Sequence, residues 1–132
     1  MICEYLDTLN DRPILIPNEK DARFKILHLA AIADGLMDTA VAGYMEKIRH
    51  PQGLNEQFVQ SQEATIERTF QFFNQHVEKF KNLSYASIAI ACAIGYVNFR
   101  LPHLFVKEKY SGLSTWFEEF SKRPSMVLTM PH

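Results

Sequence analysis

Apolar residues recur at steps of three and four along the chain, which is the spacing of one face of an α-helix. A first long helix is predicted from about Lys20 to Ile48, with its apolar side at Ile26, Ala30, Ala33, Met37, Ala40 or Val41, and Tyr44. Strict alternation of apolar and polar residues never persists, and no Asn-Gly or Asp-Gly hairpin turn separates two strand patterns. The pattern therefore predicts an all-α helical bundle.

Two further helices follow the same periodicity. One is predicted from Asn55, a good N-cap, to Phe80, with an apolar side made of Phe58, Ile66, Phe70, Phe73, Val77 and Phe80. The other begins at about Gly112 or Ser114, ends at Lys122, and carries Leu113, Trp116, Phe117 and Phe120. Pro124 closes this helix, and a short turn from Ser125 ends the chain.

A helix between these two has the best-specified start. Ser84 is an N-cap, and Leu83 and Ile88 occupy the two positions of a hydrophobic staple. Ser87 stands where a capping box has its reciprocal acceptor, although serine is a short one. From Ile88 to Val97 the helix is apolar all round, which predicts a central helix surrounded by others, with Cys92 as a buried structural residue.

The first 17 residues have a different organisation. Residues 1–9 have the pattern of a helix end, the turn Asn10–Pro13 breaks it, and an extended link Ile14–Pro17 follows. This segment is dense in apolar side chains, so we expect it to be buried against the rest of the chain, another domain or a second copy.

Composition narrows the classes of protein. The 132 residues are 47% apolar and 22% charged, as in one ordinary globular domain, and the net charge of −1 implies neither a nucleic acid nor a membrane as partner. Two cysteines, Cys3 and Cys92, form no disulfide framework, and a start with acidic residues does not fit a secretory signal, so a cytoplasmic location is expected. The five histidines show no helical pairing, and no metal site is predicted.

Several segments, taken in order, resemble the C-terminal all-helical domain of cytosolic glutathione S-transferases, especially the small bacterial members. The matching segments are Ile2–Leu6, Leu15–Pro17, Ala33–Asp38, Leu83–Ala91, Gly95–Arg100, Trp116–Phe120 and Arg123–Ser125. Their order and spacing are more specific than any of them alone. One departure is Ser87, because the capping box of that family normally has Asp at this position.

The resemblance implies a division of the chain and of the activity. Residues 1–17 would be the end of the preceding domain's last helix plus a linker, and residues 18–132 the helical domain. The preceding thioredoxin-like domain carries the family's catalytic residue and glutathione site, so we expect no catalytic or glutathione-binding residue here and no activity from this chain alone. Glutathione would be the co-substrate of the intact enzyme, a hydrophobic electrophile its second substrate, and a homodimer its assembly.

An alternative function follows from the same resemblance. Helical domains of this type also serve as noncatalytic protein-association modules, which would need no substrate. An in-frame thioredoxin-like segment upstream would favour the enzyme over the module.

One stripe of small residues on the first long helix is a candidate site. Ala31, Gly35, Asp38 and Ala42 recur at steps of four, three and four. Either another helix packs into this groove or it forms a wall for the hydrophobic substrate. The candidate wall consists of Ala31, Asp34, Gly35, Met37, Asp38, Ala42 and Tyr44. The like charges of Asp34 and Asp38 predict compensation by Arg68, Arg100 or a partner subunit.

Overall fold

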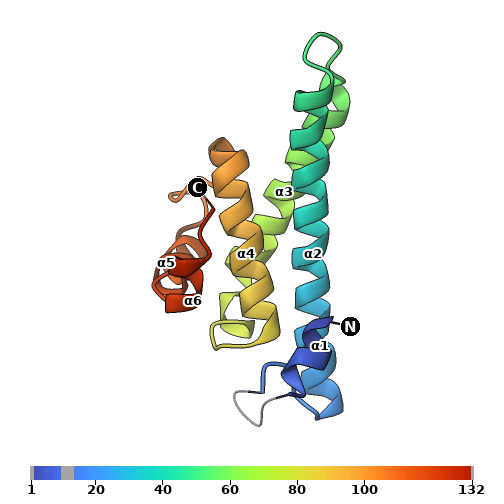
Figure 1. Cartoon of the computed structure of the whole chain (residues 1–132). Coiled ribbons are helices and arrows are strands. Elements are labelled where there is room, and N and C mark those ends of the chain that lie inside the picture. Colours follow the sequence, from blue (N-terminus) through green and yellow to red (C-terminus); the bar gives the residue numbers. More distant parts are fainter. Residues whose placement is uncertain (1, 10–13, 132) are drawn as a thin grey trace.

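Helices account for all the regular structure of the described residues, 2–9 and 14–131, in this computed structural model. They are α1 (Ile2–Asp7), α2 (Lys20–Arg49), α3 (Glu56–Gln75), η1 (Val77–Lys79), α4 (Tyr85–Arg100), η2 (Pro102–Leu104), α5 (Ser111–Phe120) and α6 (Pro124–Leu128). The predicted all-α class is confirmed. Figure 1 shows α4 between α2 and the α5–α6 pair, with α1 beside one end of α2. The predicted turn at 10–13 lies outside the described residues.

Helix α2 has the predicted extent, and its start is capped by a side chain. The Glu19 carboxylate accepts hydrogen bonds from the backbone N–H groups of Asp21 and Ala22, at 2.9 and 2.7 Å. The buried face consists of Leu29, Ala30, Ala33, Leu36, Ala40 and Gly43. By length and composition alone α2 is able to cross a membrane, a test that the core helices of soluble proteins also pass.

A close approach between α2 and α3 lies at Gly43, a residue that the sequence analysis did not single out. A Cβ at this position would lie 3.3 Å from the Cβ of Gln62 on α3, tighter than ordinary van der Waals contact. The absence of a side chain at Gly43 therefore lets α2 and α3 pack closely.

Helix α3 begins at the predicted N-cap but ends earlier than expected. Asn55 Oδ1 accepts a hydrogen bond from the Phe58 N–H at 3.0 Å, whereas the predicted end at Phe80 is wrong because the α-helix stops at Gln75. His76 leaves the helical conformation, and its N–H bonds the Phe73 carbonyl three residues back, which tightens the chain into η1. This turn still places Phe80 in the core. Phe58 is exposed, so its predicted place on the apolar side is wrong.

The capping box of α4 is present. Ser84 Oγ accepts from the Ser87 N–H at 3.2 Å, and Ser87 Oγ accepts from the Ser84 N–H at 2.8 Å. Ser87 is fully buried, so its hydroxyl satisfies a backbone group that water cannot reach. Leu83 and Ile88, the predicted staple residues, are partly buried against the core.

An aromatic cluster joins α3, η1, η2 and α5. Its members are Phe70, Phe73, Phe80, Phe105, Tyr110, Trp116 and Phe120. Phe80 meets Trp116 edge to face with centroids 4.9 Å apart, and Phe70 meets Phe105 in the same way at 5.0 Å. The Asn74 side chain adds a polar tie, because its Oδ1 accepts from the Leu113 N–H at 2.9 Å. Together these contacts hold α5 on α3.

The N-terminal segment is tied to the bundle through its link and through an ion pair between Glu4 of α1 and Arg23 of α2. The Asp7 carboxylate accepts from the N–H groups of Leu15 and Ile16 at 2.8 and 2.9 Å, and the Leu15 carbonyl accepts from the Tyr85 N–H at 3.0 Å. Ile16 is buried, but five large apolar side chains before it are each more than half exposed: Ile2, Tyr5, Leu6, Leu9 and Ile14. Among the described residues of this segment, the expected burial within the chain is met only at the link.

The capping box makes a stability prediction. Ser84→Ala is expected to lower the free energy of unfolding by about 0.5 to 2 kcal/mol, because it removes the N-cap acceptor. Ser87→Ala is expected to cost about 1 to 3 kcal/mol, because it leaves the Ser84 N–H without its partner in a buried place. Chemical denaturation followed by circular dichroism measures both.

Ser114→Ala is the matched control. Ser114 is also buried on a helix, but its hydroxyl has no partner among the described residues, so removing it is expected to change stability by less than about 0.5 kcal/mol. Equal effects of all three substitutions would contradict a special role for the capping box.

Candidate functional site

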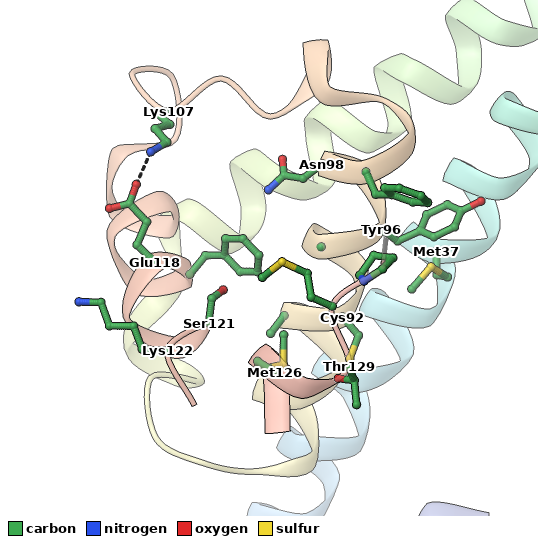
Figure 2. A pocket seen from close by; sticks show the side chains of 16 residues that line it. Met37, Cys92, Tyr96, Asn98, Lys107, Glu118, Ser121, Lys122, Met126 and Thr129 are labelled. Atoms are coloured by element: carbon green, nitrogen blue, oxygen red, sulfur yellow. Dashed lines mark hydrogen bonds and ion pairs between the residues drawn. The ribbon is translucent and has the colours of Figure 1, made fainter. Parts of the chain in front are cut away.

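A cavity of about 890 Å³ opens between α4 and the C-terminal part of the chain. Its apolar wall includes Met37 from α2, Ala91, Cys92 and Tyr96 from α4, Phe117 from α5 and Met126 from α6. Figure 2 shows Met37, Cys92, Tyr96 and Met126 around one space. The lining includes three aromatic rings and three thioethers, which suit an apolar, polarizable ligand.

The cavity exists because one face of α4 is left open, although the helix lies between α2 and the α5–α6 pair. Ile90, Ile94 and Val97 are fully buried in the core. The opposite side carries Cys92, Tyr96 and Phe99, at steps of four and three, and it lines the cavity. The prediction that other helices surround α4 is therefore confirmed for its core face but not for the face that lines the cavity, because the wall of an open apolar cavity and a buried face have the same sequence pattern.

Cys92 is exposed in this cavity, which corrects its predicted burial as a core residue. Partial desolvation by the apolar wall raises the pKa of its thiol. The thiol therefore stays protonated at neutral pH, and its reactivity is low since the thiolate is the nucleophile.

Charged residues lie at one rim of the cavity. Lys107 forms an ion pair with Glu118, drawn in Figure 2, which raises the pKa of the lysine and lowers that of the carboxylate. Lys122 pairs with Glu119 in the same region. These side chains are mostly exposed, so their contribution to stability is small.

Of the candidate substrate wall on α2, only Met37 lines the cavity. Ala31, Asp34, Gly35 and Asp38 are exposed, and Ala42 is half-buried. A Cβ built at Gly35 meets nothing within 4 Å, so no described part of the chain packs onto the stripe there.

The other wall candidates, Tyr44, Asp34 and Asp38, do not line the cavity either. Tyr44 packs beneath Arg100, whose guanidinium carbon is 5.0 Å from the ring centroid, and its hydroxyl accepts from Arg100 Nη1 at 3.3 Å. Asp34 and Asp38 make no ion pair with any described residue, because Arg100 contacts Tyr44 and Arg68 bonds Thr65. Compensation by Arg68 or Arg100 is therefore not observed at this pair.

The sequence did not single out most of the cavity residues, among them Gly95, Tyr96, Asn98 and Ser121. Two signals were present: a second apolar stripe on α4, and one amide, Asn98, near the end of an otherwise apolar helix. Among the described residues, no three His, Cys, Asp or Glu side chains gather as metal ligands would.

Comparison with known proteins identifies the family. The family model described as the glutathione S-transferase C-terminal domain matches residues 52–119, just over half of the chain. The chain belongs to this family.

A curated relative supports the assignment. The uncharacterized GST-like protein YibF of Escherichia coli (strain K12) is 30% identical over 104 residues, which cover 76% of this chain and 52% of the relative. This chain therefore spans about half the length of the curated relative that it matches.

Solved glutathione transferases share the whole fold of this C-terminal domain. A family member from Pseudomonas fluorescens Pf-5, with bound S-(propanoic acid)-glutathione, is 36% identical with a TM-score of 0.93, over 99% of this chain and 69% of the other. A glutathione S-transferase from Methylobacillus flagellatus KT, with glutathione bound, is 33% identical with a TM-score of 0.92, over 100% of this chain and 68% of the other. The glutathione S-transferase C-terminal fold extends over essentially the full chain.

The environment of Cys92 makes a prediction about its reactivity. Alkylation by iodoacetamide, followed by peptide mass spectrometry over a pH series, is expected to reach its half-maximal rate at a higher pH in the folded chain than in the chain unfolded by denaturant. The reason is that desolvation in the cavity disfavours the thiolate. An equal or lower midpoint in the folded chain would contradict this description of the cavity wall.

Proposed function

We propose that residues 18–132 form the helical half of a glutathione transferase and bind its hydrophobic electrophilic substrate in the cavity beside α4. The observation that carries this proposal is an apolar cavity of about 890 Å³ in a fold of the glutathione S-transferase C-terminal type. A cavity of this size suits a small organic ligand.

Glutathione is proposed as the co-substrate of the intact enzyme. It is bound in the related structures from P. fluorescens and M. flagellatus, whose chains are longer than this one. In the proposed enzyme the thioredoxin-like domain holds glutathione and activates its thiol, and residues 1–17 are the end of that domain's last helix plus the linker. The exposed apolar side chains of α1 support this division, because α1 has no buried residue within this chain.

The contribution of this chain to the reaction is positioning. The apolar wall removes the electrophile from water and holds it in one place, so that a glutathione thiolate from the adjoining domain meets it at short range. The side chains of Tyr96, Phe117 and Met126 supply contact area for this purpose. We place the protein in the cytoplasm and assign no catalytic residue, metal or nucleic-acid partner to the chain.

A noncatalytic protein-association module is the second candidate. The observation that favours it is the open stripe through Ala31 and Gly35, which no described part of this chain covers. In that case the stripe would serve assembly, and the cavity would have no substrate.

Turnover distinguishes the two functions. The 132-residue chain alone is expected to show only the background rate of glutathione with a general electrophile such as 1-chloro-2,4-dinitrobenzene. Joined to the thioredoxin-like domain of a bacterial relative, it is expected to show enzymatic turnover, and Gly95→Leu in the joined protein is expected to lower kcat/KM at least about tenfold. A leucine fits at Gly95 because nothing lies within 4 Å of a built Cβ, and it would occupy the cavity.

Gly35→Leu is the control in the same assay. Gly35 has as much open space around it as Gly95, but it does not line the cavity. The kcat/KM of Gly35→Leu is therefore expected to stay within about twofold of the wild-type value. A loss with Gly35→Leu and none with Gly95→Leu would move the substrate wall to the stripe on α2. Turnover by the chain alone, or none by the joined protein, would contradict the proposed enzyme.

Self-association through the α2 stripe is proposed as well. Sedimentation at micromolar concentration is expected to show a dimer, because small residues let two copies approach closely around a two-fold axis. Gly35→Leu is expected to weaken this dimer without harming the fold, since its side chain meets no part of the chain. Gly95→Leu is expected to leave it intact, and a monomer at every concentration would refute the proposal.

A further inference from the structure

We propose that Met126 and Met130 form an oxidation-sensitive latch. Their thioethers hold the C-terminal segment against the cavity, and oxidation of the two sulfurs to sulfoxides by a hydroperoxide releases this segment. The C-terminal segment is residues 124–131, which comprise α6 and the three residues after it. This inference rests on the proposed function, because it adds redox regulation to the same cavity.

The C-terminal segment has no polar tie to the rest of the bundle. Among the described residues, all its hydrogen bonds stay within residues 123–129. The Met126 N–H donates to the Arg123 carbonyl at 2.9 Å, and Thr129 Oγ1 donates to the Ser125 carbonyl at 2.7 Å. The ion pairs of the described chain all lie outside this segment. Side-chain packing therefore holds it in place.

Methionine side chains supply this packing. Met126 is partly buried against the core, and both Met126 and Met130 line the cavity. Figure 2 shows Met126 in the cavity with Cys92 of α4. The other large apolar side chains of the segment, Val127 and Leu128, are 55% and 83% exposed and contribute little. Helix α6 has only five residues, too few to be stable in water without such contacts.

A hydroperoxide changes a thioether contact from apolar to polar. The sulfur lone pair attacks one peroxide oxygen, an S–O bond forms as the O–O bond breaks, and the sulfur loses two electrons. The leaving hydroxide or alkoxide takes the proton and departs as water or an alcohol. The sulfoxide that remains is polar, so its burial against an apolar wall is unfavourable. Oxidation at Met126 therefore favours the released segment.

Release of the segment removes one wall of the cavity. Met126, Thr129, Met130 and Pro131 are the lining residues that the segment contributes. A ligand loses its apolar contact with this wall when the segment leaves, so its affinity falls. The wall on α4 stays in place, because the core face of that helix is buried.

Two other methionines allow the effect to be assigned. Met37 also lines the cavity, whereas Met45 does not, and both are half-buried on α2. Helix α2 has 30 residues and packs on α3 and α4, so oxidation at Met37 or Met45 leaves the C-terminal segment in place. Met130 is 54% exposed and Met126 faces an open cavity, so a dissolved oxidant reaches both sulfurs of the latch.

The test compares the 132-residue chain before and after treatment with hydrogen peroxide. Peptide mass spectrometry confirms sulfoxides at Met126 and Met130, and dithiothreitol is added to every sample to reverse cysteine oxidation. Amide hydrogen exchange in the C-terminal segment is expected to become at least about fivefold faster, while exchange in α4 keeps its rate. Binding of N-phenyl-1-naphthylamine, a neutral apolar fluorescent probe, is expected to weaken at least about fivefold.

Variants with leucine in place of methionine are the controls. Met126→Leu combined with Met130→Leu keeps apolar side chains of similar size but has no thioether in the segment. Peroxide is therefore expected to change its exchange and its probe affinity by less than about twofold. Met45→Leu and Met37→Leu are each expected to respond to peroxide as the wild type does. Methionine sulfoxide reductases A and B are expected to restore the oxidised wild type.

The outcomes separate this inference from the proposed function. Sulfoxides at Met126 and Met130 with unchanged exchange in the segment would overturn the latch, as would an equal loss of affinity in the double variant. The cavity would remain a binding site in both cases. Failure of the probe to bind the untreated chain would refute the binding function, whereas the exchange measurement needs no ligand and still decides on the latch. If circular dichroism shows that the double variant does not fold, exchange in the oxidised wild type decides.

Discussion

The rotational position of α4 is the constraint on which the rest of the structure depends. The reciprocal bonds between Ser84 and Ser87 determine where this helix begins, and each residue of shift would turn its faces by about 100°. With the observed start, Ile90 and Ile94 lie in the core while Cys92 lies in the cavity. The capping box therefore sets both the packing and the lining of the candidate site.

The aromatic cluster sets the second wall of the cavity. Phe80 reaches the core only because α3 ends at Gln75 and η1 turns the chain, and its edge-to-face contact with Trp116 holds α5 in place. Phe117 then lies one position after Trp116, on the side of α5 that is turned toward α4. A change in the length of α3 would thus move a wall of the cavity that α3 itself does not form.

Periodicity and capping chemistry predicted the parts of the fold that local physics controls. Spacing and side-chain type predict the bounds of α2, the N-caps Asn55 and Ser84, and the apolar residues of α5. The end of α3 was not predicted. At His76 the backbone N–H bonds the Phe73 carbonyl and the α-helix ends, and no sequence pattern marks this turn. The cavity was missed since an apolar helix face carries no sign of whether another helix or empty space lies beside it.

Three glycines show the same limit at single positions. Gly43 is in tight contact with Gln62, whereas Gly35 and Gly95 each have open space where a side chain would be. The sequence pattern of small residues drew attention to Gly35, yet the glycine of α2 that is closely packed within the chain is Gly43, 8 residues further along. Because Gly35 lies on the stripe and Gly95 in the cavity, the two open glycines belong to separate surfaces. A substitution at one of them changes one surface without the other, which allows assembly and ligand binding to be separated in the same chain.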